Sequence, residues 1–84
     1  MGPVRNVEII FKPEVSHMVK RNIWHPTQTL KEKKDGSLVL KMRVSCYIPL
    51  ISWILGWGEN AEIIKPESIR SEVTRIAKEM SESY

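Results

Sequence analysis

The sequence predicts an α+β fold in which helices cover one four-stranded antiparallel sheet. Some stretches alternate apolar and polar residues as strands do, and others repeat apolar residues at helical spacing. The predicted order is strand, helix, strand, strand, helix, strand, helix. This order is the split βαβ, ferredoxin-like pattern (β-α-β-β-α-β) with an extra C-terminal helix. Right-handed crossovers would place both crossover helices on one face of the sheet.

The composition is typical of one small globular domain. The chain has 84 residues, of which 42% are hydrophobic and 27% charged, so residues 1–84 are expected to form a single domain with residues 1–6 as a leader. The only cysteine, Cys46, excludes an internal disulfide and favours a reducing, cytoplasmic compartment. The longest apolar run, residues 47–57, is shorter than the ~20 residues that span a bilayer. A net charge of +3 is compatible with an anionic partner but does not establish one.

The first strand is predicted for residues 7–12 and the first helix for residues 13–21. The strand alternates with period two, and Pro13 suits the first position of a helix. The helix should bury apolar residues that lie three and four positions apart, namely Val15, Met18 and Val19. Pro26 disfavours helical backbone at the residue before it, so this segment ends there.

A hairpin should join a second strand at residues 27–33 to a third at residues 37–46. A two-residue loop would turn Leu30 outward, whereas a three-residue loop with a left-handed Gly36 sets it opposite Leu40. We predict the three-residue loop because Leu30 is the only large apolar residue of its strand. The inward face of the third strand would then carry Leu38, Leu40, Met42, Val44 and Cys46.

The second helix, predicted from Pro49 to about Leu55, has almost no polar face. A surface helix of a small domain usually shows one apolar stripe, so this helix is expected to bury a second side against another domain or subunit. Gly56 or Gly58 should end it in a left-handed conformation. The residues expected to make the inter-domain or dimer contact are Leu50, Ile51 and Ile54.

A fourth strand at residues 61–65 and a last helix from Pro66 complete the pattern. Two ion pairs are expected on the polar side of this helix, and residues 81–84 are expected to fray. The pairs are Arg75 with Glu79 and Lys78 with Glu82. The apolar side should carry Ile69, Val73, Ile76, Ala77 and Met80.

The sequence shows no catalytic or metal-binding constellation. Cys46 and His25 would make a nucleophile and base, but a thiol on an inward strand face is buried and unreactive. His17 is expected in solvent and His25 in a packed or capping position, since no third metal ligand lies near them. We therefore expect no enzyme, no metal and no cofactor.

Five basic residues are expected to share the sheet face opposite the helices: Lys12, Lys31, Lys33, Lys41 and Arg43. Such a face would suit a phosphate backbone, and the alternative function is therefore a single-strand nucleic-acid-binding module. The predicted face lacks the exposed aromatics that stack bases, and a run of charge is more often only solvated. Packing is likewise a commoner role than a ligand cage for the three tryptophans Trp24, Trp53 and Trp57.

Three motifs together resemble the WYL C-terminal extension, or WCX, which ends bacterial helix-turn-helix regulators. They are Trp24-His25-Pro26-Thr27-Gln28, then Asp35-Gly36-Ser37, then Trp53-Ile54-Leu55-Gly56-Trp57-Gly58 with Ala61-Glu62 and Pro66. The resemblance runs from about Val7 to Met80 and implies a ferredoxin-like fold.

The resemblance also implies a function. In such regulators a winged helix binds operator DNA, and the WYL domain senses an effector, in some members single-stranded DNA or another nucleic-acid signal. The extension helps dimerisation and couples sensing to DNA binding. This chain would then be a C-terminal piece of a longer, homodimeric regulator. Its expected partners are a WYL domain of the same chain or of the dimer mate, and a single-stranded nucleic acid or small-molecule effector, with no membrane.

Overall fold

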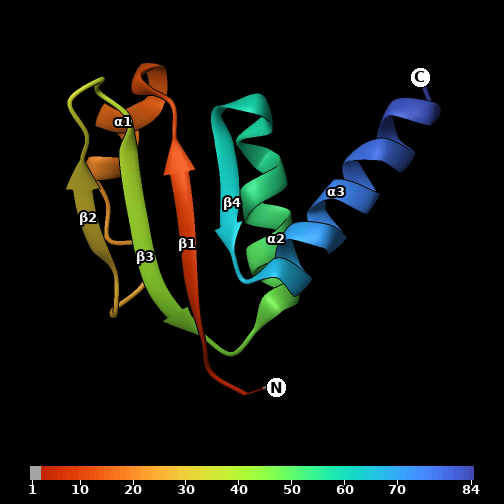
Figure 1. The fold of residues 1–84 in the computed structure, drawn as a ribbon, viewed down its shortest axis with the longest axis horizontal. Helices are drawn as coiled ribbons and strands as arrows, with labels where there is room; N and C mark the ends of the chain where they lie inside the picture. Colours follow the sequence, from red (N-terminus) through yellow and green to blue (C-terminus); the bar gives the residue numbers. More distant parts are fainter. Residues whose placement is uncertain (1–2) are drawn as a thin grey trace.

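The computed structural model describes residues 3–84 and shows the predicted order of elements (Figure 1). The sheet is antiparallel, with strand order β2-β3-β1-β4. This confirms the ferredoxin-like fold with an added C-terminal helix. The elements are β1 (Arg5–Phe11), α1 (Pro13–Lys20), β2 (Thr29–Glu32), β3 (Leu38–Val44), α2 (Tyr47–Gly56), a 3₁₀ turn (Gly58–Asn60), β4 (Ala61–Lys65) and α3 (Glu67–Glu82).

Several boundaries differ from the prediction. β1 begins at Arg5, so Arg5 and Asn6 belong to the sheet and not to a leader. β2 is only four residues long because the chain before it forms a turn, in which the Gln28 backbone N–H donates to the His25 carbonyl at 3.1 Å. The last helix continues to Glu82 instead of fraying at residue 81.

The core lies on one side of the sheet, between the sheet and the helices. Alternate residues of β1 and β3 face each other there, for example Ile9 opposite Leu40 and Phe11 opposite Leu38. The two crossover helices, α1 and α2, cover this same side, as the crossover rule predicts. They add Val15, Val19, Leu50 and Ile54 to the core, and the first turns of α3 add Ile69.

The hairpin has the predicted three-residue loop. Leu30 lies opposite Leu40 and packs against the core. Gly36 is left-handed, with φ of 89°, and its N–H donates to the Lys33 carbonyl at 3.0 Å. A Cβ on Gly36 would also lie 3.2 Å from the Cβ of Pro13. Glycine is therefore required here by conformation and by space.

Two predicted core residues lie elsewhere. Met18 is 44% exposed, and Ser16 takes its place on the inner side of α1, where its hydroxyl donates to the Pro13 carbonyl at 3.2 Å. Cys46 is exposed, contrary to the prediction of a buried strand residue. β3 ends at Val44, and Cys46 is the residue that precedes the first turn of α2. The alternation that would have turned its thiol inward has therefore stopped.

An aromatic cluster fills the end of the core beneath α2. Trp24 and Trp53 have ring centroids 5.3 Å apart, and Trp57 lies 5.3 Å from Phe11 in an edge-on arrangement. Trp24 is 36% exposed, and its indole N–H donates to the Val19 carbonyl at 2.9 Å. The three tryptophans therefore pack against one another and against Phe11.

The motif around Trp24 has a local physical role. The side-chain carbonyl of Gln28 accepts hydrogen bonds from the backbone N–H groups of Trp24 at 2.5 Å and His25 at 3.1 Å. His25 Nδ1 lies 2.8 Å from the Thr27 hydroxyl. These bonds fix the turn between α1 and β2, and thereby hold Trp24 over the end of the core.

Candidate interaction surfaces

The structure brings together three of the five basic residues predicted for the open face of the sheet. In the strand registers, Lys41 lies opposite Thr29 and Glu8, Arg43 lies opposite Asn6, and Lys31 lies opposite Val39. All three basic residues are on the face away from the helices. Lys33 instead lies in the hairpin turn beyond β2. Lys12 follows β1, and its ammonium is 3.9 Å from a carboxylate oxygen of Glu59.

A hollow of about 400 Å³ lies on this open face, and we call it the basic hollow. Lys65 lines it together with Lys41 and Arg43. The pairing of β1 with β4 shifts register between Glu8 and Ile9, so Lys65 lies opposite Glu8. Sequence reasoning missed Lys65 because simple alternation carries no sign of this irregularity. The other lining residues are Asn6, Val7, Glu8, Thr27, Thr29 and Met42.

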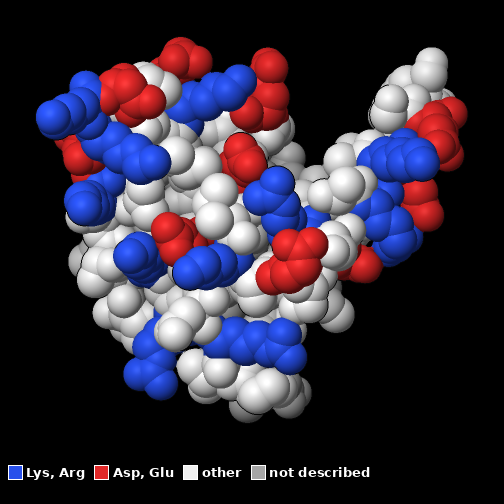
Figure 2. All heavy atoms as spheres, viewed as in Figure 1, with Lys and Arg blue, Asp and Glu red and all other residues white. Residues whose placement is uncertain are grey.

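The three cations of the basic hollow are not neutralised by close carboxylates. Among residues 3–84, no Asp or Glu oxygen comes within 4.0 Å of Lys41, Arg43 or Lys65. Basic groups elsewhere do have such partners: Lys20 pairs with Glu32, and Arg70 with Glu62 at 3.4 Å. Figure 2 shows Lys and Arg spread over this view of the molecule, with Asp and Glu among them.

A second hollow, which we call the helix groove, lies between α2 and α3. Its volume is about 420 Å³. Figure 1 shows α3 running away from the rest of the domain towards its C-terminus, and Figure 2 shows the resulting notch. The apolar side of α3 is accordingly buried at Ile69, which is 3% exposed, and open at Met80, which is 50% exposed. The groove is lined by Ile54, Leu55, Gly58, Ala61, Val73, Thr74, Ala77 and Met80.

The residues expected to make α2 a contact surface are mostly used within the domain. Leu50 and Ile54 are buried, at 6% and 2% exposure, and Ile51 is half-buried against the same core. The side of α2 that stays open carries Ile48, which is 80% exposed, and part of Leu55. The left-handed residue after the helix is Gly58, with φ of 61°, as expected for one of the two glycines.

A third hollow of about 440 Å³ lies where Trp24, β3 and the start of α2 meet. Its walls are mainly apolar. His25 and Cys46 both line it, but His25 Nδ1 is engaged by Thr27, as described above. The remaining lining residues are Trp24, Met42, Val44, Ser45, Pro49, Leu50 and Trp53.

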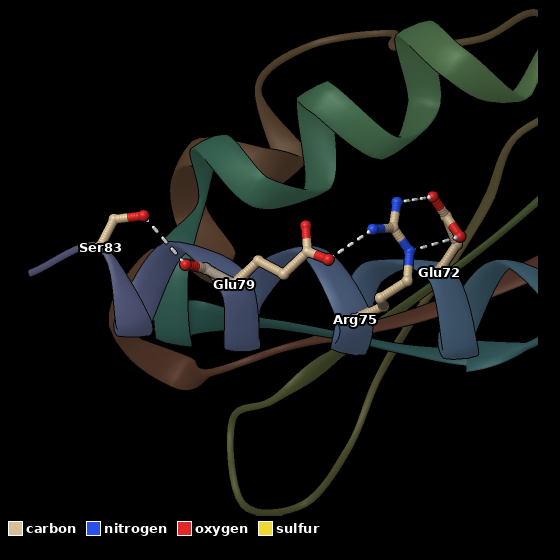
Figure 3. A network of polar contacts seen from close by, with 4 residues as sticks. All are labelled: Glu72, Arg75, Glu79 and Ser83. Atoms are coloured by element: carbon tan, nitrogen blue, oxygen red, sulfur yellow. Dashed lines mark hydrogen bonds and ion pairs between the residues drawn. The ribbon is translucent and has the colours of Figure 1, made fainter.

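The outer side of α3 is polar and internally paired (Figure 3). The guanidinium of Arg75 donates to Glu72 at 2.5 Å and to Glu79 at 3.0 Å, which confirms the predicted pair with Glu79. Bonding to Arg75 lowers the pKa of Glu72 and raises the pKa of the guanidinium. The Ser83 hydroxyl donates to the Glu79 backbone carbonyl at 3.1 Å. The second expected pair, Lys78 with Glu82, does not form within 4.0 Å.

Neither a metal cluster nor a membrane helix is found in the described part of the chain. No three His, Cys, Asp or Glu side chains gather in residues 3–84 as a metal site would require. No helix formed by these residues has the length and apolarity to cross a bilayer. His17 is exposed, as predicted.

The fold and these surfaces define a small ferredoxin-like α+β domain with one extra helix. A family model described as the WCX domain matches residues 3–81. The chain therefore belongs to the WCX domain family, which is a regulatory type of domain and not an enzyme family. No curated protein sequence matches the chain.

Proposed function

We propose that this domain is the regulatory and assembly module of a WYL-type bacterial transcriptional regulator. In that protein a winged helix outside this domain binds operator DNA. Membership of the WCX family supports the proposal, because the domain's name implies the context of a WYL regulator. The observation that carries it is the apolar side of α3, which is covered at Ile69 and left open at Met80.

The helix groove is the part of this surface that suits a partner. Each Å² of apolar surface removed from water contributes about 25 cal/mol, so a half-covered stripe gains stability when a second apolar surface fills it. The proposed partner is the WYL domain of the same chain or of the dimer mate. An effector that changes how well this partner fills the groove would shift the regulator between two states. The coupling free energy then equals the difference between these two states in the free energy of packing against the partner.

The test compares two substitutions on α3 in the full-length regulator. Met80→Glu adds a charge to the apolar side of α3 beside the groove, and Ser71→Glu adds the same charge on its opposite side, at an exposed position. We expect Met80→Glu to weaken assembly in sedimentation velocity and to reduce the effector's influence on operator binding, while Ser71→Glu changes neither. Equal behaviour of the two variants would show that the helix groove is not the contact. Circular dichroism of each variant in the 84-residue chain checks that the domain itself remains folded.

A further inference from the structure

We propose that the basic hollow binds a phosphate group. The site would be formed by Lys41, Arg43 and Lys65 on the open face of the sheet. It lies on the side of the sheet opposite the helices, so it is separate from the helix groove and does not depend on the regulatory role proposed above. Two of these residues were expected on this face from the sequence, whereas Lys65 joins them only through the register shift between β1 and β4.

The cations reach the basic hollow from two strands that flank β1. Lys41 and Arg43 are two residues apart on β3, which corresponds to about 6.8 Å along an antiparallel strand. Lys65 comes from the end of β4, on the other side of β1. A ligand seated over β1 would therefore be met by positive charge from both sides.

Neutral hydrogen-bonding groups complete the rim. Asn6 and Thr29 line the hollow, are exposed, and make no side-chain hydrogen bond to another group of residues 3–84. Their amide and hydroxyl groups are donors suited to phosphate oxygens. Thr27 has a different role: its hydroxyl accepts from the Arg43 backbone N–H at 2.9 Å and donates to the Arg43 carbonyl at 3.3 Å. This pair of bonds holds the rim beside Arg43.

The charge of the basic hollow matches a phosphate. Three cations and one carboxylate, Glu8, line it, so the formal charge is three minus one, or +2. The phosphate monoester of a nucleotide carries about −1.5 to −2 at neutral pH, and each backbone phosphate of a nucleic acid carries one negative charge. Arginine can also bind two phosphate oxygens at once, while lysine contributes a compact charge.

The surroundings favour recognition of phosphate over recognition of bases. In the paired registers the open face carries only aliphatic apolar residues, such as Ile10 and Val39. The aromatic rings of Phe11, Trp24, Trp53 and Trp57 cluster in the core side of the fold. The open face therefore offers no aromatic ring on which a base would stack. The phosphate would come either from the backbone of a single-stranded nucleic acid or from a free nucleotide.

The test uses the 84-residue chain and two triple variants of equal charge. The hollow variant, Lys41→Gln/Arg43→Gln/Lys65→Gln, removes the three positive charges of the basic hollow. The control, Arg21→Gln/Lys34→Gln/Lys78→Gln, also removes one arginine and two lysines, all exposed and without an ion pair among residues 3–84. Anisotropy of labelled oligothymidylate is measured from 50 to 200 mM salt. Amide chemical shifts of the unmutated chain are recorded with thymidine monophosphate and with inorganic phosphate.

Three phosphate contacts on a single strand correspond to a slope of about −2 in log K against log salt, or a roughly 20-fold loss of affinity over this salt range. We expect this dependence in the unmutated chain and the control, and its loss in the hollow variant. Binding of thymidine monophosphate alone, with shifts confined to the hollow, supports the site and assigns its ligand to free nucleotides. An equal loss of affinity in both triple variants would show that binding depends only on net charge, and this would overturn the proposal. Absence of binding to all three probes at 50 mM salt would overturn it as well.

Discussion

The orientation of α2 can be tested with one substitution placed at two positions of the helix. Ile54 is 2% exposed and belongs to the core, whereas Ile48 is 80% exposed. Ile54→Ala removes three carbon atoms from the core, which costs about 2.4 kcal/mol in transfer free energy at ~0.8 kcal/mol per buried CH₂. The unfilled cavity brings the expected loss into the range of about 2–5 kcal/mol. Alanine's better helix propensity offsets only roughly 0.4 kcal/mol of this loss.

Ile48→Ala is the matched control, and it should change the free energy of unfolding by less than about 0.5 kcal/mol. The difference is measurable, because a domain of this length has a total stability of about 4–13 kcal/mol. Urea unfolding followed by tryptophan fluorescence should show a midpoint lowered by about 1 M or more for Ile54→Ala, with an unchanged slope. If the two variants differ by less than about 1 kcal/mol, α2 does not present the side assigned here to the core.

Three further predictions concern the turn, the tryptophan cluster and the dependence on pH. Gly36→Ala should lower the free energy of unfolding by about 1–2 kcal/mol, because alanine is strained at positive φ and its Cβ would crowd Pro13; an unchanged urea midpoint would contradict this. Trp24→Phe keeps a ring but removes the bond to the Val19 carbonyl, and should cost about 1 kcal/mol in thermal melts, whereas no loss would show that this bond is dispensable. Hydrogen bonds from the side chain and backbone N–H of Ser37 lower the pKa of Asp35 below 3.8. Their contribution should therefore be complete above that pH and be lost as the pH falls below it. Asp35→Asn should flatten this part of the stability profile, and an unchanged profile would refute the assignment.

The sequence predicted the local structure best where only one arrangement could bury a large apolar residue. Leu30 is the only large apolar residue of β2, so only one hairpin loop kept it inside, and that loop is present. The inner side of α3 was equally predictable, because charged residues mark its outer side. In α2, apolar residues surround the helix, and the pattern did not indicate that Ile54 faces inward while Ile48 faces solvent.

Other features depend on backbone changes that leave no mark in the residue pattern. Cys46 would have faced inward had β3 continued, but the strand ends two residues earlier and the chain turns into α2. Alternation alone would have placed Lys65 on the same face as the buried Ile63, but the irregular pairing of β4 with β1 sets it opposite Glu8 on the open face. Register shifts and strand ends are set by tertiary packing, and so the basic hollow was only partly predictable.

The C-terminal part of α3 is only partly supported by the rest of the domain, so a small movement at the base of the helix becomes a larger one at its end. The helix is held against the body at Ile69, while the segment from Val73 to Glu82 extends roughly 15 Å further at 1.5 Å per residue. A tilt of about 10° about the held end would move the far end by roughly 3 Å over that length. Because helices are stiff along their axis, a small rearrangement at the base of α3 would be magnified at its tip. A probe attached near Glu82 would therefore report motion that is too small to detect at Ile69.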